Sequence, residues 1–360
     1  MCIRDRVTVV QDDITSEISR IMDYEFDGTT TFYPHEFSAI DRETTLKDFG
    51  VGLIVGPSGS GKTTLLKEFG QEVEPVWDGD KSIASHFKDI DDVQDRLGAV
   101  GFNSIPSWLR HYHVLSNGEQ FSARLARQLD SNIVVDEFTS VIDRDVAKSC
   151  SNAISRYVKK RGLKNIVFSS CHYDIIEWLQ PDWVFDTHTG KLTTRGYHRP
   201  DIVLEILPCT RDIWTIFSDH HYLDGNIHTG ASCWIAVWND RLVGFLSSLS
   251  FPSGTLKNAW RGHRTVVLQE FQGLGIGARM TEAMGELHLI EGKRYFTKTA
   301  HPRLGEFRNN SDKWRGTSKN GVARLDYNTN DTTFGGLAGG LQKHMHRMCY
   351  SHEYLSLIHI

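Results

Sequence analysis

Residues 51–64 read VGLIVGPSGSGKTT, an apolar run that leads into a glycine-rich loop. From Gly56 to Thr63 the loop matches the phosphate-loop pattern G-x-x-x-x-G-K-[ST]. Its glycines let successive N–H groups turn toward phosphate oxygens at a helix N-terminus, where the dipole favours an anion. We predict a nucleoside triphosphate site, with Lys62 on the phosphates and the Thr63 hydroxyl on Mg²⁺. The residues predicted to line it are Gly56, Pro57, Ser58, Gly59, Ser60, Gly61, Lys62, Thr63 and Thr64.

The composition is that of a globular protein with about two domains. The chain has 360 residues, of which 39% are hydrophobic and 24% charged, and its formal net charge is −5. No uninterrupted apolar run approaches the ~18 residues of a membrane span, so we expect no direct insertion into a membrane. Six cysteines without a C-x-x-C pair indicate a reducing compartment, which predicts a cytoplasmic protein.

The two ends of the chain look foreign to the rest. Residues 1–6 (MCIRDR) and 355–360 (LSLIHI) can be encoded by two DNA strings that are reverse complements of each other. Those strings resemble a transposase adapter used in sequencing libraries. We therefore interpret both hexapeptides as adapter remnants and exclude them from the prediction of domains.

Two segments after the phosphate loop predict a strand and a capped helix. Residues 97–102 are apolar and predict a short buried strand that ends at Asn103. In the segment LSNGE, residues 115–119, Ser116 stands where a helix N-cap is expected, before FSARLARQL.

Two later strands end in side chains with useful chemistry. Residues 133–135 form a β-branched strand that ends in Asp136 and Glu137. Such a strand end can present Asp136 to Mg²⁺ and Glu137 to the attacking water. Residues 166–168 form another apolar strand, which leads through a short turn to His172.

In this order the segments resemble the nucleotide-binding domain of ABC-type ATPases, over residues 7–199. The resemblance implies ATP and Mg²⁺ as cofactors and a catalytic role for His172 at the γ-phosphate. It implies that Ser116 and Gly118 contact ATP held by a second copy of the chain, so that ATP is sandwiched in a homodimer. Asp143 is then expected in the turn that crosses the dimer interface.

Two positions depart from the family pattern. The signature reads LSNGE where transporters have LSGGQ, and Asn103 stands where the family has glutamine. Only twelve residues separate Asn103 from Ser116, so the helical subdomain that docks membrane partners must be nearly absent. A transporter partner is therefore disfavoured. Phe37 is one candidate for stacking on adenine, with Phe32 and Tyr33 as alternatives.

After residue 200 the pattern changes to a hairpin, a strand, a second glycine loop and a helix. Residues 233–238 and 242–249 predict a hairpin around Asn239 and Asp240. Residues 264–268 predict the strand before the loop, and residues 278–289 predict the helix after it.

The second loop reads QGLGIGA and resembles the acetyl-CoA loop of the GNAT acetyltransferases, a resemblance that covers residues 200–354. Bare amides at a helix N-terminus again provide a site for a pyrophosphate. The same string satisfies the G-x-G-x-x-A pattern of dinucleotide-binding folds. That fold requires an acidic residue at the end of the next strand, where this chain has Lys298. The residues predicted to bind acetyl-CoA are Gln272, Gly273, Gly275, Gly277 and Ala278.

Acyl transfer from a thioester to an amine needs a base for the amine proton and often an acid for the thiolate. Glu270 is the predicted catalytic base, and His263 is the alternative. Ser311 is the candidate proton donor to the thiolate.

Together these patterns predict an α/β chain with a P-loop ABC-type ATPase domain (7–199) whose helical subdomain is much reduced. A GNAT-like α+β domain with a mixed sheet (200–354) follows. We expect ATP-driven dimerisation to gate acetyl transfer to an acceptor. Residues 257–347 carry 15 Lys and Arg against 8 Asp and Glu, which suits CoA phosphates or a nucleic acid such as RNA. The alternative is a DNA- or RNA-associated ATPase clamp. Its acetyltransferase-like domain would then be a non-catalytic binding module.

Overall fold

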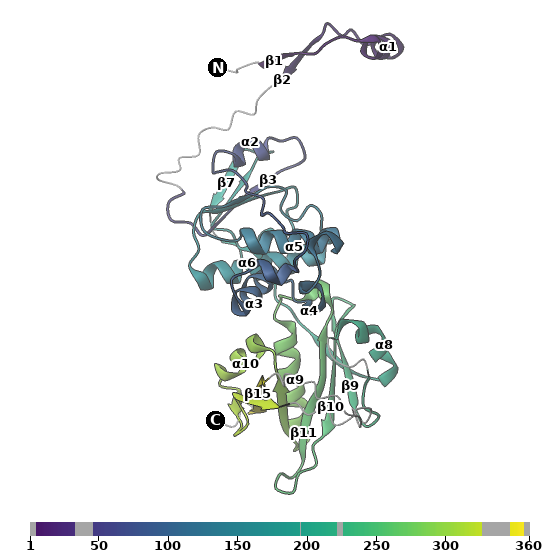
Figure 1. The fold of residues 1–360 in the computed structure, drawn as a ribbon, viewed down its shortest axis with the longest axis vertical. Helices are drawn as coiled ribbons and strands as arrows, with labels where there is room; N and C mark the ends of the chain where they lie inside the picture. Colours follow the sequence, from purple (N-terminus) through teal and green to yellow (C-terminus); the bar gives the residue numbers. More distant parts are fainter. Residues whose placement is uncertain (1–4, 33–45, 195, 222–225, 326–345, 356–360) are drawn as a thin grey trace. The chain divides into compact units, whose positions relative to one another are not determined.

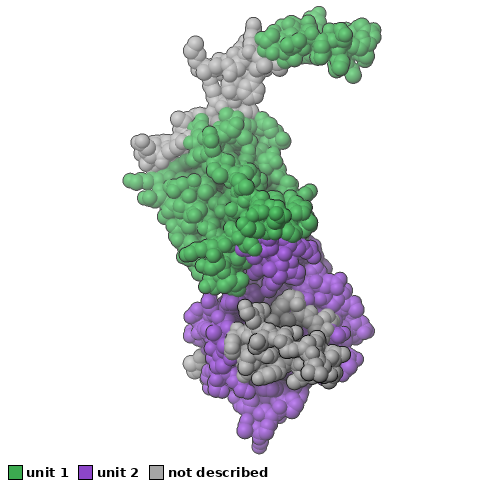
Figure 2. Space-filling model, in the orientation of Figure 1, with its two compact units in different colours: residues 1–81, 85–100, 111–200 green, residues 82–84, 101–110, 201–360 purple. Residues whose placement is uncertain are grey.

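The computed structural model describes residues 5–32, 46–194, 196–221, 226–325 and 346–355. The chain divides into two compact units, coloured separately in Figure 2. Unit 1 comprises residues 1–81, 85–100 and 111–200, and unit 2 comprises residues 82–84, 101–110 and 201–360. Each unit has its own main sheet (Figure 1).

The main sheet of unit 1 has five strands in the order β4-β5-β3-β6-β7. They are β3 (Val51–Val55), β4 (Val134–Val135), β5 (Ile166–Ser170), β6 (Trp183–Asp186) and β7 (Lys191–Thr194). All neighbours are parallel except β6 and β7. β3 and β5 are buried along their whole length, as expected for strands of a parallel sheet whose faces are both covered.

The remaining elements of unit 1 are helices and a separate two-stranded sheet. The helices are α1 (Asp13–Met22), α2 (Lys62–Leu66), α3 (Ile90–Ala99), α5 (Asn117–Gln128), α6 (Arg144–Arg161) and α7 (Ile176–Leu179). Two 3₁₀ turns are η1 (Ile83–His86), part of which belongs to unit 2, and η2 (Tyr112–Val114). β1 (Asp5–Thr8) pairs with β2 (Thr29–Phe32). Leu65 and Leu66 of α2 pack with Trp183 in one buried cluster of the main sheet.

The strand predicted at residues 97–102 is wrong, because the first half of that segment is the end of α3 and the second half is in no strand. The Asp89 side chain accepts a hydrogen bond from Asp92 N and so caps the helix. Val93 and Leu97, four residues apart, are both buried, so the apolar residues of the segment follow the period of a helix.

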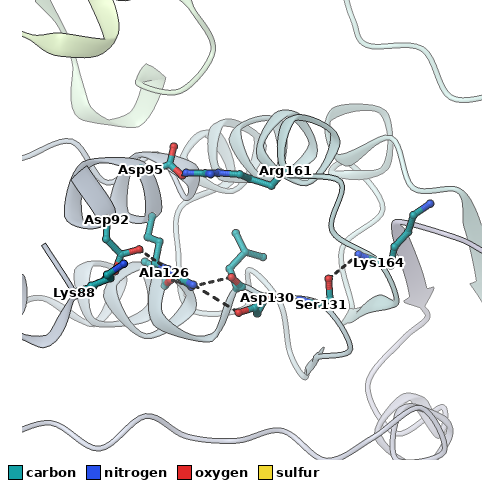
Figure 3. Close-up of polar contacts among 10 residues, drawn as sticks. Lys88, Asp92, Asp95, Ala126, Asp130, Ser131, Arg161 and Lys164 are labelled. Carbon is teal, nitrogen blue, oxygen red and sulfur yellow. Dashed lines mark hydrogen bonds and ion pairs between the residues drawn. The ribbon is translucent and has the colours of Figure 1, made fainter. Parts of the chain in front are cut away.

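Charged side chains tie α3 to the neighbouring helices α5 and α6, as Figure 3 shows. Arg96 donates to Asp92 Oδ1 at 2.9 Å and to Leu129 O at 3.0 Å, so it closes the C-terminal end of α5. Arg161 at the end of α6 pairs with Asp95. These contacts fix the end of α5 that is opposite to Ser116.

The sheet of unit 2 has the order β13-β15-β12-β11-β10-β9-β8, and β14 pairs with β15. Its strands are β8 (Glu205–Cys209), β9 (Ser232–Trp238), β10 (Arg241–Ser250), β11 (Ala259–Val267), β12 (Arg294–Thr299), β13 (Trp314–Gly316), β14 (Val322–Leu325) and β15 (His346–Tyr354). Only β11 and β12 are parallel neighbours. They are joined through the helix α9 (Ile276–Ile290), as a parallel connection requires.

Short helices complete unit 2. They are α4 (Ile105–Trp108), α8 (Trp214–Phe217) and α10 (Pro302–Asn309), with 3₁₀ turns η3 (Arg211–Ile213), η4 (Ser218–His220) and η5 (Gln269–Phe271). The predicted hairpin is confirmed as β9 and β10. Asn239 and Asp240 both have positive φ, of 50° and 59°, which matches the twist of a tight hairpin turn. In the described part of the chain no helix is long and apolar enough to cross a membrane.

The core of unit 2 forms where α9 packs on the sheet. Met280 and Met284 of α9 are fully buried. Gly285 lets the helix approach closely, since a Cβ there would lie 2.3 Å from Tyr354 Cδ1. The His288 ring stacks with Trp260 and Tyr295, at centroid distances of 5.1 and 5.2 Å.

Two buried histidines should make unit 2 sensitive to acid. His288 Nε2 lies 2.9 Å from Ser248 Oγ, and His352 Nε2 lies 2.8 Å from Asn309 Oδ1. Burial lowers the pKa of each from 6.5 to about 4. The unfolded chain therefore binds these protons near pH 6.5, whereas the folded chain binds them only near pH 4. Stability should fall as pH falls through this window, by up to about 1.4 kcal/mol per pH unit for each histidine.

Urea unfolding at several pH values, followed by tryptophan fluorescence, measures this effect. His288→Phe keeps an aromatic ring in the stack but removes one titrating group. We expect a shallower dependence of the unfolding free energy on pH in this variant. If the pH dependence of the unfolding free energy were the same in His288→Phe and the wild type, His288 would not be the source of the acid sensitivity.

Candidate functional site

The phosphate loop lies between β3 and α2, as predicted. Gly61, the residue before α2, has φ of 84° and provides no side-chain cap. The first-turn N–H groups of α2 are therefore not occupied by a capping side chain, which leaves them for an anion. Within the loop, Ser60 N donates to Pro57 O at 3.3 Å and Lys62 Nζ donates to the same oxygen at 2.8 Å.

Gly56 is required by close packing against Thr187. A Cβ at Gly56 would lie 2.0 Å from Thr187 Oγ1. That hydroxyl lies 2.6 Å from Ser60 Oγ and donates to Val55 O at 3.1 Å. Thr187 thus contacts both Val55, the residue before the loop, and Ser60 within it, and only a glycine at position 56 leaves room for its side chain.

The strand order brings the other predicted ATPase residues to the same edge of the sheet. β5 lies between β3 and β4, and all three are parallel, so their carboxyl ends meet. The phosphate loop follows β3, Asp136 follows β4, and His172 follows β5 by two residues. Asp136, His172 and the loop therefore share one edge of unit 1.

Asp136 is oriented by hydrogen bonds to one of its two carboxylate oxygens. Oδ1 accepts from Glu137 N at 2.9 Å and from Ser169 Oγ. Among the residues that the structure describes, none donates to Oδ2, which is therefore available to a cation. Asp136 shares this sheet edge with the loop that carries Thr63, and carboxylate and hydroxyl oxygens are ligands that Mg²⁺ prefers.

Glu137 and His172 differ in exposure and restraint. Glu137 is exposed, has φ of 47°, and accepts from Ser140 Oγ at 3.5 Å. His172 is half-buried, and its backbone N–H donates to Ser170 Oγ at 3.1 Å. Partial burial, reinforced by the Arg144 charge, lowers the pKa of His172, which keeps the ring neutral at neutral pH.

The N-cap predicted at Ser116 is confirmed. Ser116 Oγ accepts from Glu119 N at 3.3 Å, and Glu119 Oε2 accepts from Ser116 N at 3.1 Å. This is a capping box, in which a glutamate three residues after the cap is favoured. Gly118 is half-buried beside Ile142.

Other predicted positions are placed as follows. Asp143 is the N-cap of α6, where its carboxylate accepts from Asp145 N at 2.9 Å. Asn103 belongs to unit 2, where its Nδ2 donates to Gly101 O at 3.2 Å. Phe37, Tyr33 and the side chain of Phe32 lie outside the described residues.

In unit 2, β11 and β12 separate beside the second glycine loop. Their pairing covers only residues 259–261 and 294–296. Opposite β10 the register shifts at His263, since Gly262 faces Ser248 while Arg264 faces Ser247. The bulge bends β11 and leaves the backbone of residues 262–267 without a partner in β12. The sequence did not predict this split, although Gly262 within a strand is a signal for a bulge.

The loop at residues 272–278 repeats the geometry of the phosphate loop. Gly273 and Gly275 have φ of 93° and 84°, and Gly275 begins α9 without a side-chain cap. Gln272 Nε2 donates to Val267 O at 3.0 Å, while its Oε1 is buried without a hydrogen bond. Gly277 lies against Val267, and a Cβ there would be 3.4 Å from Val267 Cγ2. These residues fit a pyrophosphate at the N-terminus of a fifteen-residue helix.

The three predicted acid–base residues lie in different elements of unit 2. Glu270 is half-buried in η5, His263 lies at the bulge of β11, and Ser311 lies between α10 and β13. His263 Nε2 accepts from His228 N at 3.3 Å. Burial, with the charge of Arg264, lowers the pKa of His263 to about 4.

Comparison with protein families finds one match. Residues 199–300 match the family described as acetyltransferase (GNAT) family. The match covers β8 to β12 and the loop at residues 272–278. Unit 2 therefore contains a GNAT acetyltransferase domain with a mixed sheet, which confirms that part of the sequence-based prediction.

A comparison with curated proteins finds no match. Among solved structures, an IAA acetyltransferase from Bacillus cereus ATCC 14579 is similar at 15% identity, over 43% of this chain and 99% of that chain, with a TM-score of 0.29. The ribosomal-protein-S18-alanine N-acetyltransferase from Escherichia coli gives 10% identity over 42% and 93%, with a TM-score of 0.29. A bacterial ABC transporter cassette gives 14% identity over 42% and 88%, with a TM-score of 0.31.

The packing of Gly56 leads to a stability prediction. Gly56→Ala should lower the free energy of unfolding by about 1–3 kcal/mol, because the new methyl group overlaps Thr187. Gly59→Ala is the matched control, since its Cβ meets no atom within 4 Å and only its φ of 77° is unfavourable. The control should lose about 1 kcal/mol. Chemical denaturation compares the two, and a larger loss in the control would contradict the packing argument.

Proposed function

We propose that the chain is an ATP-dependent acetyltransferase. In this proposal residues 200–354 transfer an acetyl group from acetyl-CoA, and residues 7–199 are an ABC-type ATPase that binds and hydrolyses ATP. The family match over residues 199–300 carries the acetyl-transfer part. The complete phosphate loop at the end of β3, on the sheet edge that also holds Asp136, supports the ATPase part.

Acetyl-CoA supplies an acetyl group activated as a thioester, and it carries a pyrophosphate that the protein must bind. The proposed pyrophosphate site is the start of α9, with Gly273 and Gly275 in the loop before it. The unpaired edge of β11 offers backbone N–H and C=O groups to an extended ligand. Gly277 and Ala278 let the ligand approach the first turn of the helix.

The acetyl step needs one base and one acid. The amine of the acceptor forms a C–N bond to the acetyl carbonyl, its proton passes to the Glu270 carboxylate, and the C–S bond breaks. The departing thiolate takes a proton, for which Ser311 is the proposed donor. His263 is less suited as the base, because its Nε2 already accepts a backbone hydrogen bond.

In the ATPase part, Lys62 binds the terminal phosphates and Asp136 Oδ2 with Thr63 holds Mg²⁺. Glu137 orients the attacking water, and the neutral His172 contacts the γ-phosphate. Each chain has one phosphate loop and one signature, so two chains complete two sites as a homodimer. We propose that this ATP-driven dimer gates acetyl transfer in the cytoplasm, with RNA as a candidate acceptor because residues 257–347 are basic.

Binding of acetyl-CoA is tested by thermal shift. Acetyl-CoA at a hundred times its dissociation constant should stabilise the wild type by about 2.7 kcal/mol. Gly275→Glu places a carboxylate at the proposed pyrophosphate site and should abolish the shift. Gly254→Glu is the control, because Gly254 lies in an open loop with no atom within 4 Å of a built Cβ. No shift in the wild type would favour the alternative, a DNA- or RNA-associated ATPase clamp in which the acetyltransferase-like domain is a non-catalytic binding module.

Dimerisation is tested with Glu137→Gln, which should bind ATP without hydrolysing it. Sizing chromatography should show a dimer with ATP and a monomer without it. Lys62→Ala is the control and should stay monomeric in both. A Glu137→Gln protein that remains monomeric with ATP contradicts the sandwich. The acceptor can then be sought by mass spectrometry of RNA and protein from cells that express the wild type or Lys62→Ala.

A further inference from the structure

Residues 71–77, here called the strap, follow α2 and connect it to the rest of unit 1. The proposed ATPase function uses none of their side chains. The strap has no regular secondary structure. It begins after Gly70, which lies beside β4, since a Cβ there would be 3.5 Å from Val134 Cγ1. It then contacts two features of the proposed ATPase site, the end of β4 and the helix α5.

The first contact is made by Glu72 at the end of β4. Its Oε2 accepts from Asp136 N at 3.1 Å. Among the strands that the structure describes, β4 lies at the edge of its sheet and pairs with β5 alone. An amide on the outer side of an edge strand has no ladder partner, so the Glu72 carboxylate takes the place of a neighbouring strand. A carboxylate makes this a charge-assisted hydrogen bond, which is stronger than a neutral one.

The second set of contacts lies on one face of α5. Gln128 Nε2 donates to Val73 O at 2.8 Å and lies 3.4 Å from Glu72 Oε1. Arg127 Nη1 donates to Val76 O at 2.6 Å, and Arg124 pairs with Glu74. The three α5 residues are spaced three and four apart, so they share a face of the helix.

The end of the strap is anchored close to the signature. The Trp77 ring stacks on Tyr112, with centroids 4.4 Å apart and planes within 8°. The Arg127 guanidinium lies 4.7 Å from the Trp77 centroid. Tyr112 precedes the signature serine, Ser116, by four residues. The strap thus contacts the backbone of Asp136, Tyr112 just before the signature, and the last turn of α5 just after it.

Asp136 is consequently held from two sides. Ser169 and Glu137 hold its Oδ1, and Glu72 holds its backbone N–H. These contacts set the direction in which the remaining oxygen, Oδ2, points. We infer that Glu72 is a positioning residue that aims Asp136 at Mg²⁺. The inference rests on the ATPase part of the proposed function.

The experiment compares Glu72→Ala and Glu72→Gln with Glu74→Ala as the matched control. Glu74 lies in the same strap and pairs with α5, but its described contact is to Arg124 and not to Asp136. Three quantities are measured in the full chain: the Mg²⁺ concentration for half-maximal ATP hydrolysis, ATP affinity without a divalent cation, and amide hydrogen exchange over residues 134–138.

We expect Glu72→Ala to raise the half-saturating Mg²⁺ concentration about tenfold, as the loss of an outer-shell partner of a metal ligand does. ATP affinity without Mg²⁺ should stay unchanged, while amide exchange at residues 134–138 should speed up. Glu72→Gln keeps an oxygen that can accept from Asp136 N, so it should recover most of the Mg²⁺ response. Glu74→Ala should behave as the wild type in all three measurements.

Three outcomes of the Mg²⁺ and ATP measurements would overturn the inference. One is a wild-type Mg²⁺ response in Glu72→Ala, and another is an equal response in Glu74→Ala. The third is an equal loss of ATP affinity in Glu72→Ala with and without Mg²⁺. That result would indicate a merely structural role for Glu72. A wild type that neither binds nor hydrolyses ATP refutes the proposed ATPase, and unchanged amide exchange in Glu72→Ala separately refutes the contact itself.

Discussion

Both candidate sites depend on a helix that begins at a glycine and has no side-chain cap. α2 begins after Gly61 and α9 after Gly275, and both glycines have φ of 84°. A residue with a Cβ is disfavoured in this conformation. Because no side chain occupies the first-turn amides, they remain as donors for an anion. The helices α1, α3, α5 and α6 begin instead with side-chain caps, at Asp12, Asp89, Ser116 and Asp143.

The sheets place these helix starts beside other chemical groups in different ways. In unit 1 the strands are parallel and β5 separates β3 from β4, so the loops after all three strands share an edge. In unit 2 a single parallel pair, β11 and β12, parts beyond residue 261. Where the two strands separate, the backbone of β11 has no partner in β12 close to the loop that precedes α9. The candidate anion site at the helix start thus lies on the same sheet edge as Asp136 and His172 in unit 1, and next to an unpaired strand edge in unit 2.

Outer-shell contacts restrict the groups at these sites. The Asp136 carboxylate uses one oxygen for Ser169 and Glu137, which leaves the other oriented. Glu72 supports the same residue from a segment more than sixty residues earlier. In unit 2, His263 holds the backbone of His228 through a neutral ring nitrogen. Such contacts join residues that lie far apart in the sequence. No short sequence pattern therefore predicts them.

The sequence by itself determined the two glycine loops, the β9–β10 hairpin, the Ser116 cap and the acetyltransferase character of residues 199–300. Each rests on neighbours within a few positions, where glycine conformation and side-chain capping act locally. The apolar run at residues 97–102 wrongly predicted a strand. The helix cap at Asp89 and the four-residue spacing of the buried Val93 and Leu97 favour the helix α3 instead. Only the tertiary structure decided the strand order, the bulge at His263 and the contact of Glu72 with Asp136. These features depend on which strands become neighbours, and that is set by packing of the whole unit rather than by any short segment.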